Sequence, residues 1–135
     1  MKVVCDTNVL VSGSLFGGHP REILRLAAQG TIHNYASPDI FHELEDVLLR
    51  PKFGLTPTQV NGVLQIYRSL FETTVPSIRV FELETDPEDN KILEAALSAR
   101  VDYIISGDRD LLDLETWRGI RVTSPADFIM KIMGR

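Results

Sequence analysis

The sequence predicts an α/β fold, a three-layer α/β/α sandwich around a central, mainly parallel sheet of about five strands. Two observations predict it. Short apolar runs of strand length alternate with longer amphipathic segments, as in proteins whose parallel sheet is covered by helices on both faces. Most of the longer segments begin with a proline that follows serine, threonine or aspartate, which is typical of a helix start.

The expected elements alternate along the chain. Strands are expected at residues 2–5, 32–36, 78–83, 103–106 and 120–123. Helices are expected near residues 20–29, 38–50, 57–71, 87–100 and 125–133. The last four helices follow the pairs Ser37-Pro38, Thr56-Pro57, Asp86-Pro87 and Ser124-Pro125, and the weaker pair His19-Pro20 precedes the first. Residues 52–56 and 73–77 are expected to be loops.

The composition is that of a folded globular protein. The chain has 135 residues, of which 44% are hydrophobic and 24% charged, so we expect a single domain over residues 1–135 with one hydrophobic core. No apolar run is long enough to cross a bilayer, and Asp6 interrupts the first apolar run too early for a signal peptide. The one cysteine, Cys5, excludes an internal disulfide, which fits a reducing cytoplasm.

The charge limits how the protein binds nucleic acid. A net charge of −5 and a pI of about 5.1 exclude a generally basic binding surface. Nucleic acid would have to be bound through a local basic patch or through bound cations.

Acidic residues follow two of the predicted strands. Asp6 ends the first strand, and Asp108 and Asp110 follow the fourth. In parallel sheets, ligands bind outside the carboxyl ends of the strands, where the strand order switches direction. If the first and fourth strands are neighbours, Asp6 and Asp108 project into one crevice. Each of these acids also has a structural interpretation, as a turn former or a helix cap.

Two further acids lie on predicted helices. Asp89 lies near the centre of an apolar stripe, in line with Leu93 and Ala96. An acid on a buried face needs a partner or a metal ion, and the alternative for Asp89 is a capping box at the helix start. In the helix from residue 38, Glu43 and Glu45 flank the apolar stripe on opposite sides, and periodicity does not choose between them.

The order of these residues resembles the PIN domain (PilT N-terminal) nuclease family over nearly the whole chain. The residues that carry the resemblance are Asp6-Thr7-Asn8, Glu43, Asp89 and Ser106-Gly107-Asp108-Arg109-Asp110. The segment DPEDNKILEAAL followed by DYIISGDRDLL resembles the toxin-component branch of toxin–antitoxin systems. Serine stands at position 106, where many members of the family have threonine.

The resemblance implies a metal-dependent ribonuclease that hydrolyses phosphodiester bonds of single-stranded or structured RNA. Carboxylates without nearby histidine or cysteine suit hard cations, here Mg²⁺ or Mn²⁺. The implied catalytic acids are Asp6, Glu43, Asp89 and Asp108, and the implied metal ligands are Asp6, Asp89, Asp108 and Asp110. Thr7, Asn8 and Ser106 would support them, with Arg109 as a phosphate contact. The choice of Glu43 over Glu45, and the pairing of the first and fourth strands, follow from the resemblance.

The resemblance also implies partners, namely a small antitoxin protein and a second copy of the chain in a homodimer. Two other functions were weighed. One is a PIN fold retained for binding without catalysis, against which the complete set of acids speaks. The other is a receiver-like, Mg²⁺-binding phosphoacceptor domain. That domain needs a basic residue near the end of its last strand, whereas Thr123-Ser124-Pro125 ends this one.

Overall fold

A computed structural model describes residues 1–81, 83 and 87–135 of the chain. Its centre is a six-stranded sheet in the order β3-β2-β1-β4-β6-β5. The strands are β1 (Lys2–Cys5), β2 (His33–Ala36), β3 (Glu72–Thr73), β4 (Tyr103–Ile105), β5 (Thr116–Trp117) and β6 (Ile120–Thr123). All neighbours pair in parallel except β5, which is antiparallel to β6. The predicted α/β class, the mainly parallel sheet and the pairing of the first and fourth predicted strands are confirmed.

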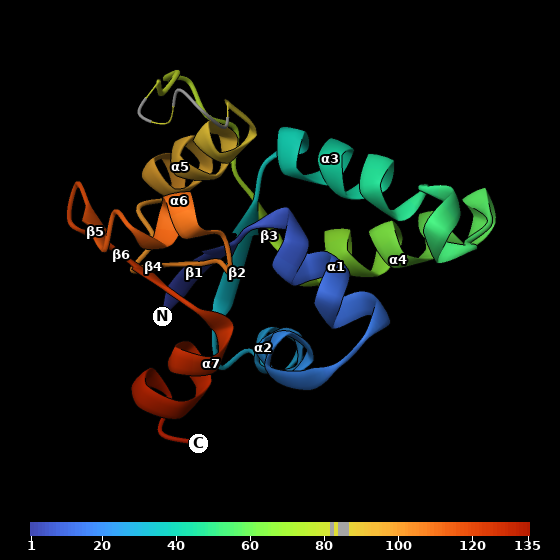
Figure 1. The fold of residues 1–135 in the computed structure, drawn as a ribbon, viewed down its shortest axis with the longest axis horizontal. Helices are drawn as coiled ribbons and strands as arrows, with labels where there is room; N and C mark the ends of the chain where they lie inside the picture. Colours follow the sequence, from blue (N-terminus) through green and yellow to red (C-terminus); the bar gives the residue numbers. More distant parts are fainter. Residues whose placement is uncertain (82, 84–86) are drawn as a thin grey trace.

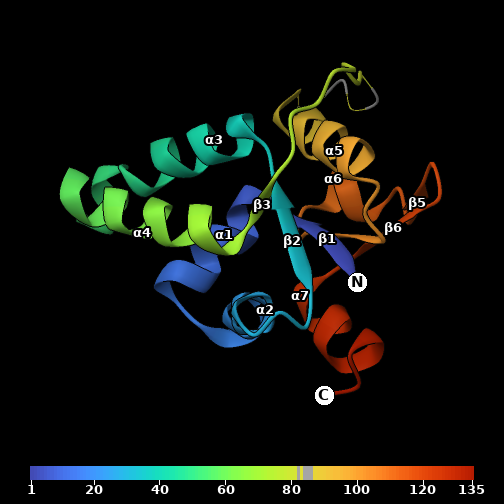
Figure 2. The same ribbon diagram turned by 180° about the vertical axis from the view of Figure 1, so that it is seen from behind.

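Helices cover both faces of this sheet, as Figures 1 and 2 show. They are α1 (Thr7–Leu15), α2 (Gly18–Ala28), α3 (Pro38–Leu48), α4 (Pro57–Leu70), α5 (Pro87–Ala99), α6 (Arg109–Leu112) and α7 (Pro125–Asp127), which continues as a π-helical segment (Phe128–Ile132). On one face, the Lys2 ammonium donates to the Ala99 carbonyl at the end of α5, 3.4 Å away. On the other face, the Tyr103 ring packs edge-on against Phe128, with 5.8 Å between ring centroids. The predicted three-layer arrangement is therefore present.

The helix starts follow the sequence signals closely. Ser37, Thr56 and Ser124 cap α3, α4 and α7 through their side-chain oxygens. Thr56 and Gln59 form a capping box, with N–H···O distances of 3.1 and 2.9 Å. The capping box predicted for α5 depends on Asp86, which lies outside the described residues.

The core is continuous between the sheet and its helices. β1 and β4 form its centre, and Val3, Val4, Ile104 and Ile105 are fully buried. Such strands are apolar on both sides because helices cover both faces of the sheet. Of the helices that the described residues form, none is both long enough and apolar enough to cross a membrane.

The strand predicted at residues 78–83 is wrong within the residues that the structure describes. Residues 78–81 and 83 are not in a strand. The third strand along the chain is instead β3, which begins directly after the helix expected at 57–71 and includes the first residue of the loop expected at 73–77. The Val80 side chain is buried, but its backbone N–H donates to Glu94 Oε2 of α5 at 2.8 Å. Val80 is thus a buried residue with exposed neighbours, as in a half-buried strand, but it lies in a loop. Its N–H binds the Glu94 carboxylate of α5 instead of a carbonyl of a neighbouring strand.

Two more elements were not predicted. α1 begins directly after β1, and the hairpin strand β5 precedes β6. The expected helix near 20–29 also begins two residues earlier, at Gly18. α1 is apolar around much of its surface, with Val9, Leu10 and Val11 all buried, so it lacks the one-sided stripe by which helices are recognised in a sequence.

Candidate active site

The strand order switches direction at β1. The next strand along the chain, β2, lies on one side of β1, and β4 lies on the other. The chain leaves both β1 and β4 at the same edge of the sheet, where the backbone N–H of Asp6 donates to the Ile105 carbonyl at 3.0 Å. This is the position at which open α/β sheets bind their ligands.

Asp6 is buried at this switch point, with 3% of its surface exposed. It is the N-cap of α1, and its Oδ1 accepts a hydrogen bond from the Val9 N–H at 2.9 Å. Its Oδ2 accepts a short hydrogen bond from the Ser106 hydroxyl. The cap interpretation and the ligand interpretation of Asp6 are therefore compatible, because one oxygen caps the helix while the other faces β4.

Ser106 connects the two predicted acids. It is fully buried, and its backbone N–H donates to the Thr123 carbonyl of β6 at 2.9 Å. Its Oγ donates to Asp6 and accepts from the backbone N–H of Asp108, at 2.9 Å. Asp108 caps α6 by accepting from the Asp110 N–H at 2.8 Å. One serine thus fixes Asp6 and Asp108 relative to each other.

The electrostatics of this junction raise the pKa of the Asp6 carboxyl above its usual value. Burial is the largest cause, and the negative charge of Asp108 adds to it. The hydrogen bonds from the Ser106 hydroxyl and from the Val9 and Asn8 N–H groups act in the opposite direction without reversing the effect. A charged Asp6 is therefore unfavourable in the absence of a cation.

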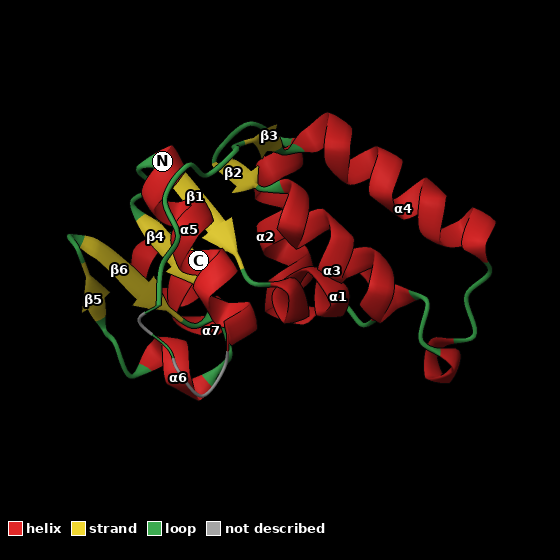
Figure 3. Cartoon of the chain, turned by 90° about the horizontal axis from the view of Figure 1, so that it is seen from above, coloured by secondary structure: helices red, strands yellow, loops and turns green. Residues whose placement is uncertain are grey.

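Thr7 brings a third acid toward Asp6. The Thr7 side chain is buried, and its Oγ1 donates to Glu43 Oε2 of α3 at 3.0 Å. Periodicity left Glu43 and Glu45 equivalent, and the structure gives Glu43 the contact with the residue that follows Asp6. α1 and α3 pack side by side (Figure 3), which places this contact at the same edge of the sheet.

The remaining predicted residues lie on α1, α5 and α6. Asp89 is half-buried in the first turn of α5. The last turn of α5 leads into the start of β4, so the first turn of α5 lies toward the edge of the sheet at which β4 ends. Asp110 is half-buried on α6. Asn8 and Arg109 are exposed, and the structure shows Asn8 acting on Asp6 through its backbone N–H.

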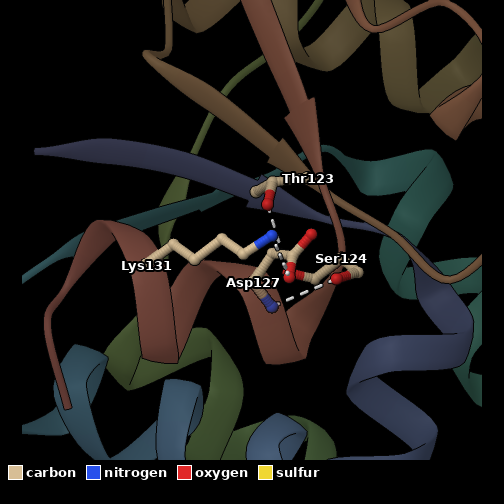
Figure 4. Close-up of polar contacts among 4 residues, drawn as sticks. All are labelled: Thr123, Ser124, Asp127 and Lys131. Carbon is tan, nitrogen blue, oxygen red and sulfur yellow. Dashed lines mark hydrogen bonds and ion pairs between the residues drawn. The ribbon is translucent and has the colours of Figure 1, made fainter.

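The end of β6 provides a contrast at the same edge (Figure 4). Ser124 caps α7 by accepting from the Asp127 N–H at 3.1 Å, and the Thr123 hydroxyl donates to the Ser124 carbonyl at 3.3 Å. The exposed Asp127 pairs with the Lys131 ammonium at 3.4 Å. Here the acid is balanced by a cation from the protein, whereas the Asp6 carboxylate accepts from a neutral hydroxyl, which itself accepts from the backbone N–H of Asp108.

The donors at the junction fit a hard divalent cation. All are oxygens, and the repulsion between Asp6 and Asp108 is what such a cation would relieve. Over residues 1–81, 83 and 87–135, no three His, Cys, Asp or Glu side chains stand close enough to hold a metal ion by themselves. Mg²⁺ needs no such cage, because it commonly binds through one or two carboxylates and completes its shell with water and phosphate oxygens.

Comparison with known proteins identifies the family. The chain matches the PIN domain family over residues 2–110. It belongs to the PIN domain family. The matched segment extends from β1 into α6 and contains Asp6, Glu43, Asp89, Asp108 and Asp110. PIN domains are nuclease domains that generally use divalent metal ions.

A solved structure has the same fold. The chain is similar to a chain in the crystal structure of VapBC2 from Rickettsia felis bound to a DNA fragment from their promoter. The TM-score is 0.63 at 14% sequence identity, and the match covers 92% of this chain and 98% of that one. Comparison with curated proteins gave no match.

Proposed function

We propose that this PIN domain is a metal-dependent endoribonuclease that hydrolyses phosphodiester bonds of single-stranded or structured RNA. The observation that carries the proposal is the junction of Asp6, Ser106 and Asp108 at the switch point of the sheet. A buried acid that is repelled by a second, half-buried one weakens the fold, and a site that binds a cation explains why the two are kept.

The residues at the junction have distinct roles in this proposal. Asp6 and Asp108 would hold Mg²⁺ or Mn²⁺, with Asp89 and Asp110 contributing directly or through water. The cation would supply Lewis-acid stabilisation of the charge that develops on the phosphate. Ser106 and Thr7 keep Asp6 and Glu43 in place through their hydroxyls. Glu43 would orient the attacking water.

The surface beside Glu43 supports the approach of a phosphate backbone. A hollow of about 340 Å³ opens there, and its lining contains the acids Asp39, Glu43 and Asp46 together with His42, Arg50 and Lys91. Arg50 and Lys91 provide positive charge beside the acids in a chain whose net charge is −5. Arg109, exposed next to Asp108, would be a further phosphate contact.

We further propose that the protein is the toxin component of a toxin–antitoxin pair in the cytoplasm, with a small antitoxin as partner and a homodimer as its own assembly. The likeness to a chain of the VapBC2 structure, which covers almost the whole of both chains, supports the antitoxin partner. A PIN fold kept only for binding is the alternative, and the retention of Asp6, Glu43, Asp89 and Asp108 favours the enzyme.

An RNA cleavage assay tests the proposal. Wild-type protein should cut unstructured RNA with Mg²⁺ or Mn²⁺ and stop when EDTA is added. Asp6→Asn and Asp108→Asn should each lose at least about a hundredfold in rate, because cation stabilisation of the transition state is worth several kcal/mol.

Two acids provide matched controls. Asp102→Asn changes an exposed acid at the opposite end of β4, and Asp127→Asn changes the ion-paired acid beyond β6. Both should cut RNA at close to the wild-type rate. A folded Asp6→Asn/Asp108→Asn double variant that cuts as fast as these controls would disprove the assignment of the site.

A further inference from the structure

A second feature of the surface is a pair of aromatic rings beyond the ends of α1 and α3. Phe16 is 72% exposed, the centroid of its ring is 6.4 Å from that of Phe53, and the two rings are tilted by 58°. The two residues line a hollow of about 560 Å³ together with Leu15 and Lys52. We call these four residues the aromatic hollow. Two neighbouring aromatic rings beside a hollow make the aromatic hollow a candidate binding surface.

Each of the two phenylalanines stands directly before a backbone turn. Phe16 is the C-cap of α1, and its N–H donates to the Ser12 carbonyl at 2.9 Å. Each phenylalanine is followed by a glycine with positive φ, 98° at Gly17 and 64° at Gly54. Glycine adopts this conformation without the strain that other residues would meet. Both rings therefore stand next to turns whose backbone conformation glycine allows.

The charge beside the rings is positive. Lys52 Nζ lies 5.1 Å from the centroid of the Phe53 ring, and among the described residues that line the aromatic hollow the charged side chain is that of Lys52. Arg50, two residues earlier, lines the neighbouring hollow beside Glu43. Aromatic faces next to Lys or Arg are how proteins hold unpaired bases, since every base has a stacking face and is linked to a negative phosphate.

The position of the aromatic hollow relates it to the candidate active site. α1 begins at Thr7, next to Asp6, and ends at Leu15, so its nine residues span about 13 Å. α3 carries Glu43 near the acids and ends beside Arg50, two residues before Lys52. Two helices that pack side by side (Figure 3) thus connect the acids to the aromatic hollow, with Arg50 between them.

We propose that Phe16 and Phe53, with Lys52 beside them, form a stacking subsite for an unpaired base of the RNA. This inference rests on the proposed ribonuclease function, and it adds that the protein grips single-stranded substrate at a distance from the bond that is cut. An RNA chain whose scissile phosphate lies at the acids of the candidate active site would pass Arg50. A base several nucleotides from the scissile phosphate would then stack against Phe16 and Phe53.

Steady-state cleavage of unpaired RNA by variants of the aromatic hollow tests the subsite. Phe16→Ala and Phe53→Ala should each raise KM about tenfold for a substrate long enough to reach the rings. They should leave kcat unchanged and have no effect on a substrate too short to reach the rings. Phe16→Trp keeps a stacking face and should retain the wild-type KM. Lys52→Ala should reduce the slope of the logarithm of the binding constant against the logarithm of the salt concentration by about one, which corresponds to one lost phosphate contact.

Ile66→Ala is the matched control, because Ile66 is another large apolar side chain, 57% exposed, on α4. It should leave KM unchanged for both substrates. A second measurement uses 2-aminopurine placed at successive positions of the RNA in EDTA, where no cleavage occurs. Wild type should quench the fluorescence at one position, and Phe16→Ala should abolish that quenching.

The outcomes separate the subsite from the proposed function. If wild type cuts RNA and Phe16→Ala keeps the wild-type KM on long substrate, the subsite is overturned and the ribonuclease stands. If wild type quenches 2-aminopurine through Phe16 but cuts no RNA, the subsite stands and the ribonuclease fails. If Phe16→Ala changes only self-association in light scattering, a second copy of the chain covers the aromatic hollow and the subsite is overturned.

Discussion

The two ends of the sheet handle acidic residues in opposite ways. At the amino end of β4, the exposed Asp102 accepts a hydrogen bond at 2.9 Å from the backbone N–H of Lys2, a residue that itself carries a positive charge. At the same end of β2, His33 lies 3.5 Å from Glu72, and both side chains are about half exposed. At the carboxyl end, Asp6 is buried, and its side-chain partners are a serine hydroxyl and a backbone N–H.

This difference separates acids that belong to the surface from acids that form a site. Exposed charges beside basic residues contribute little to stability and cost little, because water screens them. A buried carboxylate repelled by a second one is costly unless something else binds there. The same sheet therefore carries exposed acids beside basic residues at its amino edge, and a buried acid repelled by a second one at its carboxyl edge.

The largest effect expected within this comparison is at Ser106. Ser106→Ala removes the hydroxyl that joins Asp6 to Asp108, so Mn²⁺ affinity and cleavage should each fall about 10- to 100-fold, as for other groups that orient metal ligands. Ser124→Ala, at the end of β6, should lose about 1 kcal/mol of stability as a helix cap and keep its Mn²⁺ affinity. Equal Mn²⁺ affinities in the two variants would mean that Ser106 is only structural.

A smaller effect is expected in the pH dependence of stability without metal. The pKa of Asp6 is higher in the folded protein than its value of 3.8 in the unfolded chain. Protonated Asp6 therefore contributes its full stabilisation below pH 3.8, and this stabilisation is lost as the pH rises through the pKa of Asp6 in the folded protein. Asp6→Asn cannot titrate and keeps a good N-cap for α1. In EDTA, its free energy of unfolding should therefore fall less than that of wild type as the pH rises above 3.8.

Urea unfolding of wild type and Asp6→Asn at several pH values measures this difference. Asp102→Asn provides the control from the other edge and should follow the wild-type curve. Parallel curves for wild type and Asp6→Asn would mean that Asp6 carries no unfavourable charge, and the contrast between the two edges would be lost.

The sequence was informative where local rules decide the structure. Capping residues before prolines located α3, α4 and α7, and apolar runs located β1, β2, β4 and β6. The strand-end positions of Asp6 and Asp108 followed from the same runs. Their proximity did not, because it depends on β1 pairing with β4 across about 100 residues, and only the family resemblance implied that pairing.

Other features depended on tertiary contacts that no local pattern encodes. The choice between Glu43 and Glu45 is decided by α1 packing on α3, since Thr7 is the partner of Glu43. The strand predicted at 78–83 was wrong because Glu94 of α5 binds the Val80 N–H. α1 was not predicted, although the sequence has an aspartate suited to an N-cap, Asp6, followed by the apolar Val9 and Leu10. The structure shows that Asp6 is the N-cap and that Val9 and Leu10 are buried.

The central claim is that the acids at the carboxyl edge, Asp89 included, bind a divalent cation. Thermal melting with and without Mn²⁺ tests it directly, because a ligand that binds only the folded state stabilises it by about 2.7 kcal/mol at a hundred times its Kd. The proteins to compare are wild type, Asp6→Asn, Asp89→Asn and, as the control from the amino edge, Asp102→Asn.

Wild type and Asp102→Asn should gain equally from Mn²⁺, and Asp6→Asn and Asp89→Asn should gain much less while melting no lower than wild type in EDTA. As a cap alone, Asp89 would behave otherwise: Asp89→Asn would lose about 0.3–1 kcal/mol without metal and gain as much from Mn²⁺ as wild type. An undiminished gain in Asp6→Asn as well would contradict the account of the whole edge.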